Sequence, residues 1–539
     1  MEKQGEKDMT VNEWKKKIKS GKYTFPEWAV RVYVLILAVI FPFYESNQYF
    51  SLLSDRTKFF QYSTTLLVLI LLAFFLMQIK KQRTDLREHI RRRAGENKTV
   101  CIFWGMLVLS FALSTLCSEW RKQAWTGDAG RYQGLYMWLL YAAAFFSILL
   151  YYKLGKTDFV LFLLTGIVVS SWGIFDYLGY DWFGWHRRVK LGQRAIFMSS
   201  IGNINTFTAM AGLYFSTAGG YFILKKEKFR YIDAVCIAAF IASGTAMFVG
   251  SSDNAAVGVL AFFLFLPFIA FRRKESAGRY FLLAALFCCI FIIVYQINIV
   301  SDSPYIDPQG GILLRLCGRN ALKYYAAASA LLAFVSFFIS RYKKRWNKKI
   351  VLSGYGILSA AGFLCFFLML YDANFGENPD KYGVLSRFLV FGDQWGTARG
   401  MVWRLAWESF EKFPFWQKMI GAGPETFGLL MEQNCYEEMV SISGQFYDSP
   451  HNELIQYVVC TGIFGAVSYY GCLLLCCIKG FKGKPVQMAS AVGIVVYIAI
   501  SLVNISVPIT QPFVILLAGF CTAESQNAQS QTIAGKQLK

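Results

Sequence analysis

The chain has 539 residues, of which 55% are hydrophobic and only 17% are charged. A soluble domain carries about 25% charged residues, and here the charges form short clusters between long apolar runs. A bilayer core of roughly 30 Å requires about 20 apolar residues per helix, and runs of that length recur along almost the whole sequence. The composition therefore excludes a soluble protein, and the lack of alternating segments of about 10 residues in the sequence excludes a transmembrane barrel.

Fourteen apolar segments have the length and composition of membrane spans. They are 28–43, 59–79, 99–117, 134–152, 158–178, 198–223, 231–250, 255–271, 280–299, 319–340, 350–370, 453–477, 486–504 and 509–523. The first and last are short, so the pattern predicts an all-α fold, a polytopic transmembrane helix bundle of about 12–14 spans. No small-residue cleavage site follows the first segment, so we expect it to be a retained helix.

Lysine and arginine are concentrated in every second loop, as expected for loops on the cytoplasmic side. Five such loops agree in register, and they lie in segments 80–98, 225–230, 272–274, 341–349 and 479–484. This bias accounts for most of the net charge of +21 without a nucleic-acid partner. It also predicts that both termini are cytoplasmic.

One connection is far longer than the others. Residues 371–452 form an outer segment of about eighty residues, too long for a passive turn. Apolar residues at helical spacing predict a short amphipathic helix within it that ends before Pro414; they are Val402, Trp403, Ala406, Trp407 and Phe410. The predicted organisation is a cytoplasmic N-terminal segment 1–27, a bundle 28–370 of about eleven spans, the extracytoplasmic loop 371–452, C-terminal spans 453–523 and a cytoplasmic tail 524–539.

Cations on the outer side run against this bias and require another explanation. The loop after the fifth span carries four of them between residues 185 and 194, without a carboxylate: Arg187, Arg188, Lys190 and Arg194. Arginine offers a planar fork for phosphate, so the loop is a candidate anion site; the simpler interpretation is a solvated loop near lipid headgroups. Residues 199–205, which follow, can present backbone donors at a helix N-terminus or act as ordinary caps.

The large loop contains two arginines that we interpret differently. Arg404 is expected to pair with Glu408, its i+4 neighbour, whereas Arg399 is a candidate functional cation. Downstream, Gly-x-Gly-Pro at 421–424 predicts a tight turn that leads into a helix with proline at its first position.

His451 lies where the large loop re-enters the membrane. Histidine is the side chain suited to proton transfer near neutral pH, although an interfacial histidine is more often a packing or capping residue. Asp448 and His451 lack a third ligand at fitting spacing, so no metal site is predicted. The sequence has no Walker-type phosphate loop and no DxD motif, and no cofactor is expected.

Three stretches resemble the O-antigen ligase and polymerase superfamily, whose members handle polyprenyl-diphosphate-linked glycans. Residues 451–456, His-Asn-Glu-Leu-Ile-Gln, resemble its His-Asn-x-x-Leu-Gln signature. Arg399, Trp403, Pro414, Gly421, Gly423 and Phe427 are similar to its Arg…Trp…Pro…Gly-x-Gly…Phe pattern, and Arg194 with residues 202–205 is similar to its Arg…Gly-Asn-x-Asn element. The loop 118–134, with Arg131, fits more loosely. Ser252-Asp253 stands where members often carry Ser-Arg.

The resemblance implies a metal-independent, inverting glycosyltransferase of the cytoplasmic membrane, with its active site on the extracytoplasmic face. The donor would be a glycan on polyprenyl (undecaprenyl) diphosphate, and the acceptor a hydroxyl of a glycan, lipid or protein, in surface-polysaccharide ligation or polymerisation. It implies catalytic roles for His451 and Arg399. The diphosphate would be bound by Arg194, Lys190, Arg187 and Arg188. Supporting roles would fall to Asn205, Asn452, Glu425 and Arg131.

Two other classes of protein are alternatives. A transporter or flippase of lipid-linked glycans predicts mid-span charges and two repeat-related halves, and the sequence shows few of the former and no repeat. A non-catalytic envelope-assembly protein is compatible with the Ser252-Asp253 departure. Convergence of His451 and Arg399 at the outer face would favour the transferase. The sequence does not distinguish ligase from polymerase.

Overall fold

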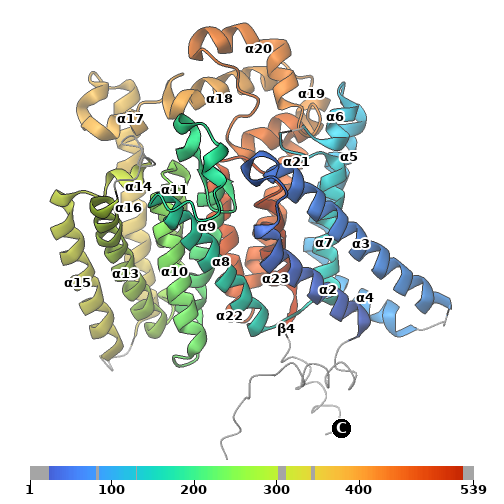
Figure 1. The fold of residues 1–539 in the computed structure, drawn as a ribbon, viewed down its shortest axis with the longest axis horizontal. Coiled ribbons are helices and arrows are strands. Elements are labelled where there is room, and N and C mark those ends of the chain that lie inside the picture. Colours follow the sequence, from blue (N-terminus) through green and yellow to red (C-terminus); the bar gives the residue numbers. More distant parts are fainter. Residues whose placement is uncertain (1–23, 81–83, 129, 302–310, 342–345, 526–539) are drawn as a thin grey trace, which may run out of the picture.

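A computed structural model describes residues 24–80, 84–128, 130–301, 311–341 and 346–525. Its helices stand side by side in a bundle, and a smaller group of helices lies across one end (Figure 1). The N-terminal segment 1–27 and the tail 524–539 fall almost entirely outside the described residues. The all-α bundle predicted from the sequence is confirmed.

Eleven helical segments in the described part are long and apolar enough to cross a membrane. The helices that form them are α2 Phe25–Leu35 with its continuation to Phe43, α3 Leu52–Lys80, α5 Lys98–Cys117, α8 Lys156–Tyr177, α9 Ile204–Leu224, α10 Tyr231–Val249, α11 Asp253–Phe265 with α12 Pro267–Ala270, α13 Lys274–Val300, α15 Arg319–Arg341, α16 Lys348–Phe375 and α21 Glu453–Phe481. Three shorter apolar helices are α7 Leu135–Tyr151, α22 Pro485–Ser501 and α23 Gln511–Thr522. Together they correspond one to one to the fourteen predicted segments.

Short elements connect these helices. Those that precede the outer segment in the sequence are η3 Gln48–Phe50, α4 Thr84–Glu96, α6 Arg121–Thr126, η4 Trp185–Arg188, η5 Leu191–Ile196 and α14 Ile312–Arg315. The outer segment itself contains η6 Pro379–Leu385, α17 Ser386–Leu389, α18 Trp395–Glu411, α19 Phe415–Ile420 and α20 Phe427–Ser443. Strand β1 (Lys153–Leu154) pairs in parallel with β4 (Glu524–Ser525).

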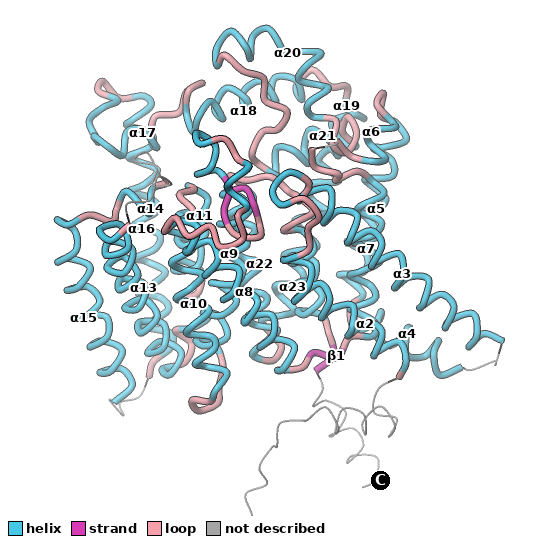
Figure 2. Tube along the Cα trace, in the orientation of Figure 1, coloured by secondary structure: helices cyan, strands magenta, loops and turns pink. Residues whose placement is uncertain are grey.

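A small hairpin lies in front of α9. Strands β2 (Phe197–Met198) and β3 (Gly202–Asn203) pair antiparallel, and Figure 2 shows this hairpin below α18. The predicted span 198–223 therefore begins too early, because its first six residues form the hairpin and the helix starts at Ile204. The hairpin connects the outer cationic loop to the N-terminus of α9.

Burial separates a central group of helices from a peripheral one. All of the apolar window of α9 is buried, against 6% for α15 and none for α16. Glycine allows the central helices to approach closely: a Cβ added at Gly220 would lie 3.0 Å from Val492 on α22. On α15 and α16, large apolar side chains such as Phe334, Phe363 and Phe367 are exposed, as expected for surfaces that contact lipid.

The outer segment lies opposite several basic connections. Helices α18, α19 and α20 lie across one end of the bundle, whereas the α9–α10 connection, which carries Lys225 and Lys228, lies at the other (Figure 1). The structure thus places the large loop and one of the predicted inner loops at opposite ends, as the charge bias requires.

Candidate active site

Helix α18 is held over the bundle by a second apolar core. Val402, Ala406 and Phe410 are buried and pack in one cluster with Phe427 and Met431 of α20. The predicted amphipathic helix is confirmed, and it ends at Glu411, before Pro414. At its other end three residues, 396–398, have φ between 61° and 64°, so the regular helix effectively begins at Arg399.

Arg399 is half-buried and has no ion pair or hydrogen bond from its side chain within the described part of the chain. Burial lowers the pKa of its guanidinium below the ordinary value, although Asp253 and Tyr447 favour the charged form. A guanidinium that has lost part of its hydration without gaining a carboxylate is suited to bind an anionic ligand.

Arg404 behaves as predicted. Its guanidinium bonds Glu408 at 3.0 Å, and also Asp393 at 2.9 Å and Glu438 at 3.0 Å. These pairs are about one-third exposed, so Arg404 is a structural residue of the outer segment. The two arginines of α18 therefore differ in their contacts, although they lie only five residues apart: Arg404 forms ion pairs, whereas Arg399 forms none among the described residues.

His451 lies in a strained turn beside the two arginines Arg399 and Arg131. Its φ is 48°, and its backbone N–H donates to Ser449 Oγ at 3.3 Å. Its Nδ1 is buried and has no hydrogen-bond partner among the described residues. Burial, together with the charges of Arg399 and Arg131, lowers the pKa of His451 to about 4, although Asp448 acts in the opposite direction. The imidazole is therefore neutral at neutral pH and one ring nitrogen can accept a proton.

The residues around His451 fix the turn. Trp403 Nε1 donates to the carbonyl of Pro450 at 2.7 Å, which ties α18 to the turn. The side chain of Asn452 accepts from the backbone N–H of Ile455 at 3.1 Å and so caps α21. The His-Asn pair of the signature thus has one half-buried imidazole with a buried Nδ1 and one helix cap.

Arg131 joins the loop 118–134 to this turn. Its Nη2 lies 2.6 Å from Asp448 Oδ2 and donates to the Asp448 carbonyl at 3.0 Å, and its Nη1 lies 3.9 Å from Glu425 Oε2. Burial lowers the pKa of Arg131, but the carboxylates of Glu425 and Asp448 outweigh this and raise it above its ordinary value. Its charge is therefore neutralised by protein, which makes it a positioning residue. Asp448 was not among the predicted site residues. The signal for it in the sequence is its position three residues before His451.

Glu425 stands at the end of the Gly-x-Gly-Pro turn with φ 57°. Burial raises the pKa of its carboxyl; Arg131 opposes the rise, Asp128 and Asp448 add to it, and the resulting pKa is about 7. Glu425 therefore titrates near neutral pH, within reach of the same arginine that supports the His451 turn.

The Gly-x-Gly-Pro turn itself differs from the prediction. Helix α20 begins at Phe427 after Thr426, so Pro424 lies outside the helix. The reason is a contact with α21, which is interrupted at Gly462 (φ 70°). The backbone N–H groups of Ala422 and Gly423 donate to the carbonyls of Val459 and Cys460 at 3.0 and 2.8 Å. A Cβ at Gly421 would lie 2.3 Å from Cys460, so glycine is required at this approach.

A cavity opens beside these residues, between the loop 118–134, α7, α21 and the α22–α23 connection. Its lining includes Arg131, Glu425, Asn452, Glu453 and Asn504. Glu453 is buried and accepts from Tyr497 at 2.7 Å and from Tyr469 at 3.2 Å. This acid belongs to the signature motif but was not selected as a site residue.

The predicted cationic loop forms a separate region. Arg187 and Lys190 are exposed. Arg188 donates to Asn47 Oδ1 at 2.5 Å and lies over the ring of Phe50, and Arg194 Nε donates to the Val189 carbonyl at 3.1 Å. In the described ranges no hydrogen bond or ion pair connects these four cations to the His451 turn. The structure does not place them in contact with the proposed catalytic pair.

Asn205 connects the two regions indirectly. Its side-chain oxygen accepts from Ser252 Oγ at 2.6 Å, and its carbonyl accepts from Asn254 Nδ2 at 2.9 Å. These bonds hold the N-terminus of α9 against that of α11. Asp253, the first residue of α11, favours the charged form of Arg399 through its negative charge. The Ser252-Asp253 departure from the family pattern therefore lies beside the candidate site, with an acid that acts on Arg399.

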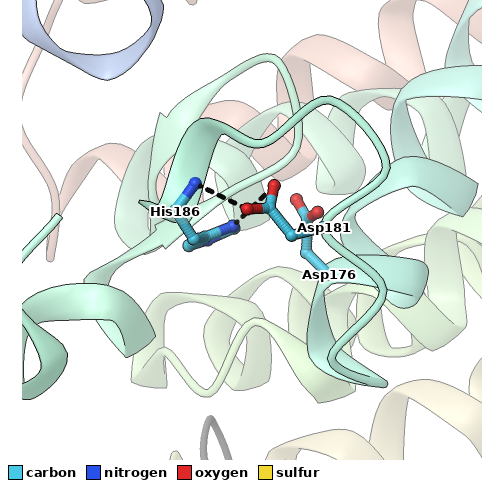
Figure 3. Close-up of side chains that lie close together, drawn as sticks. All are labelled: Asp176, Asp181 and His186. Atoms are coloured by element: carbon cyan, nitrogen blue, oxygen red, sulfur yellow. Dashed lines mark hydrogen bonds and ion pairs between the residues drawn. The ribbon is translucent and has the colours of Figure 1, made fainter. Parts of the chain in front are cut away.

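One group among the described residues has the donor types of a metal site: Asp176, Asp181 and His186 (Figure 3). Its members have other roles. His186 Nε2 donates to the Phe197 carbonyl at 2.9 Å, and Nδ1 lies 3.6 Å from Asp181. Asp181 accepts from the His186 backbone at 3.1 Å, and Asp176 accepts from the Ser199 N–H at 2.6 Å. These contacts brace the cationic loop against α8 and the hairpin.

Fold and site define an integral membrane protein in which a neutral histidine and an arginine without an ion pair among the described residues come together at one end of a helical bundle. Residues 323–470 match the family model described as O-antigen ligase. The match confirms the resemblance to the O-antigen ligase and polymerase superfamily and supports a role in glycan ligation or polymerisation at a membrane. It includes Arg399 and His451, whereas Arg131, Arg194 and Asn205 lie outside it. A comparison with curated proteins found no match.

Proposed function

We propose that the protein transfers a glycan from a polyprenyl diphosphate, of the undecaprenyl type, to an acceptor hydroxyl at the extracytoplasmic face of the cytoplasmic membrane. The reaction would ligate or polymerise a surface polysaccharide. The observation that carries the proposal is the pairing of a neutral His451 with Arg399, a half-buried arginine without a protein anion in contact. Both residues lie within the matched segment.

The proposed step is a single displacement. The acceptor oxygen attacks the anomeric carbon while the bond from that carbon to the diphosphate oxygen breaks, and the electron pair leaves with the diphosphate. The acceptor proton passes to the unprotonated nitrogen of His451. The products are the glycosylated acceptor and the free lipid diphosphate, and one displacement inverts the anomeric configuration.

The electrostatics of the site suit the two roles. A diphosphate is already a good leaving group, so the main requirement is stabilisation of its developing charge, which Arg399 can supply without a metal. His451 is neutral because burial and the two arginines disfavour its charged form. The low pKa of His451 also returns the captured proton to solvent after transfer. Because the proposed step uses no metal, a chelator is expected to leave the reaction unchanged.

The other predicted residues receive positioning or attracting roles. Arg131 and Asn452 hold the turn that carries His451, and Asn205 holds α9 against α11. The exposed cations of the loop 185–194 attract the diphosphate to the outer face. Glu425 lines the cavity described above and lies beside Arg131.

The test is glycan transfer in liposomes by the full-length protein, with lipid-diphosphate glycan extracted from the producing cells as donor and acceptor. His451→Ala is expected to lower the rate by about 10²–10⁴-fold, the usual worth of a general base. His89→Ala is the matched control, because His89 lies on α4 and bonds the Leu150 carbonyl. Transfer by His451→Ala at the wild-type rate would exclude the proposed chemistry.

A further inference from the structure

Three side chains of metal-ligating types come together outside the His451 region. Asp176, Asp181 and His186 each offer one ligand atom, and these atoms lie within 4.8 Å of one another. Asp176 stands near the end of α8, Asp181 lies in the turn that follows, and His186 lies in η4. One short stretch of chain therefore supplies all three side chains, which Figure 3 shows lying together. Asp176 and His186 are buried, whereas Asp181 is half-buried.

The two carboxylates of this group have no basic partner of the usual kind. Among the described residues, neither Asp176 nor Asp181 forms an ion pair with a lysine or an arginine. Two carboxylates so close together repel each other when both are ionised, and burial removes much of the water that would weaken the repulsion. A cation bound between them would turn this repulsion into attraction.

The orientation of the His186 ring indicates what kind of cation fits. Its Nε2 carries a hydrogen, because it donates to the Phe197 carbonyl at 2.9 Å and a carbonyl can only accept. In the neutral ring Nδ1 is then an acceptor, and it is turned toward a carboxylate, which also only accepts. Nδ1 lies 3.6 Å from Asp181 Oδ1, which is too far for a hydrogen bond. Two ligands that share a tetrahedral zinc ion at about 2.1 Å are about 3.4 Å apart.

Hydrogen bonds hold the other polar atoms of the three side chains. Asp176 Oδ2 accepts from the Ser199 N–H at 2.6 Å. Asp181 Oδ2 accepts from the His186 N–H at 3.1 Å, and His186 Nε2 is bonded to a carbonyl. Metal ligands in proteins are oriented by such outer hydrogen bonds, and the second ring nitrogen of a ligating histidine is usually bonded to a carbonyl or a carboxylate. The contacts that brace the cationic loop thus direct Asp181 Oδ1 and His186 Nδ1 toward each other.

The donor types select among the common cations. Mg²⁺ and Ca²⁺ prefer sites built from oxygen ligands, whereas zinc accepts both histidine nitrogen and aspartate oxygen. Three protein ligands leave the fourth position of a tetrahedral zinc open, and water can reach it beside half-buried Asp181. One imidazole with two carboxylates therefore favours zinc.

We propose that Asp176, Asp181 and His186 bind a zinc ion, which connects the start of the cationic loop to the end of α8. The loop 185–194 begins at this site and leads to the β2–β3 hairpin. Because an ion that binds only the folded loop stabilises it, the role of the zinc is structural. It lies outside the displacement proposed at His451, so the inference does not depend on the proposed function.

The zinc content of the purified protein tests the site directly. Full-length protein without a polyhistidine tag is stripped with EDTA, incubated with Zn²⁺ and desalted, and its metal is measured by mass spectrometry. The wild type is expected to retain about one zinc per chain. Asp176→Asn and Asp181→Asn are each expected to lower the affinity, measured by competition with a chromogenic chelator, by about tenfold or more. His451→Ala is the matched control, because it removes a histidine that lies near another carboxylate, that of Asp448, and it should retain the zinc.

Thermal unfolding and limited proteolysis report whether the ion stabilises the loop. In the wild type Zn²⁺ should raise Tm. It should also slow trypsin cleavage after the exposed Arg187 and Lys190 by about tenfold or more when free Zn²⁺ is about 100 times its Kd. Neither effect is expected in Asp181→Asn. Asparagine keeps the oxygen that accepts from the His186 N–H and removes one repelling charge, so the Tm of this variant in EDTA should equal or exceed that of the wild type in EDTA.

Four results would overturn the proposal. A wild-type protein that retains no zinc has no such site, and zinc that both variants retain is bound elsewhere. Preferential retention of Mg²⁺ or Ca²⁺ would exclude the assignment to zinc. In the transfer assay, EDTA should leave kcat unchanged at saturating donor; a loss of kcat that Zn²⁺ restores would place the ion in the transfer step and exclude a purely structural role.

Discussion

Two regions at the outer end of the bundle are rich in cations, and they differ in what the cations contact. In the region around His451, Arg131 is buried between Asp448 and Glu425, while Arg399 is half-buried without a partner in contact. In the loop 185–194, Arg187 and Lys190 are exposed to solvent. Both regions carry positive charge, but Arg187 and Lys190 remain hydrated, whereas Arg131 and Arg399 have lost much of their hydration.

The difference shows why counting charges does not locate a reaction site. An exposed cation interacts with an anion through water and salt, which weaken the attraction, whereas a desolvated arginine interacts at much lower effective dielectric. The His451 region can therefore stabilise charge in a transition state. The exposed loop can attract a ligand but contributes little to the chemical step.

The sharpest test of this contrast is Arg399→Ala. Removing this half-buried arginine is expected to lower kcat by about 10²–10³-fold, as for loss of a single donor to developing charge, with expression and Tm close to wild type. Arg404→Ala, on the same helix, is the control; its partly exposed ion pairs are worth little, so transfer should be almost unchanged. Equal losses in the two variants would show that α18 acts only as a scaffold.

Much of the fold could be predicted from the sequence because hydrophobic length is a strong signal in a membrane protein. Each of the fourteen apolar segments corresponds to a helix. The error at 198–203 has a physical cause: Phe197 to Asn203 is apolar enough to extend a span, but its backbone pairs with itself as a hairpin. Hydropathy does not report such pairing.

The site could be predicted only in part. The motif selected His451 and Arg399, whose catalytic roles stay a prediction, and the i+4 spacing predicted the Arg404–Glu408 ion pair, which is present. The distances that make Arg131 a partner of Asp448, or that leave Arg194 bonded to a backbone carbonyl, depend on segments more than one hundred residues apart or on local loop geometry. Gln133 and Trp138 carried no motif, so the cavity could not be predicted from the sequence.

The pH dependence of transfer sharpens the role of the two titrating groups in the His451 region. Burial raises the pKa of Glu425 to about 7 and lowers that of His451 to about 4. Above pH 7 Glu425 is ionised and lies 3.9 Å from Nη1 of Arg131, which supports the His451 turn; below it the carboxyl is protonated and this ion pair is lost. We therefore expect kcat/KM for the acceptor to fall as the pH drops below about 7, measured from initial rates between pH 4 and 9.

Glu425→Gln is the matched variant for this experiment, since it has the same shape and does not titrate. Its kcat/KM should be lower than that of the wild type at pH 8 but independent of pH down to the region near 4, where His451 takes up a proton and loses its function as base. A wild-type profile with its only acidic limb near pH 4 would show that ionisation of Glu425 does not affect transfer.

The smallest expected effect belongs to the exposed loop. Arg187→Ala and Lys190→Ala each remove an exposed cation, so the donor KM should rise by less than about fivefold with kcat unchanged. The increase should be largest at low ionic strength and vanish near 1 M salt, where charges further apart than about 3 Å are screened. Arg194→Ala adds a structural comparison, because its Nε holds the Val189 carbonyl. If any of these variants lowered kcat as strongly as Arg399→Ala, the loop would have to close over the donor during transfer, and the two cationic regions would form one site.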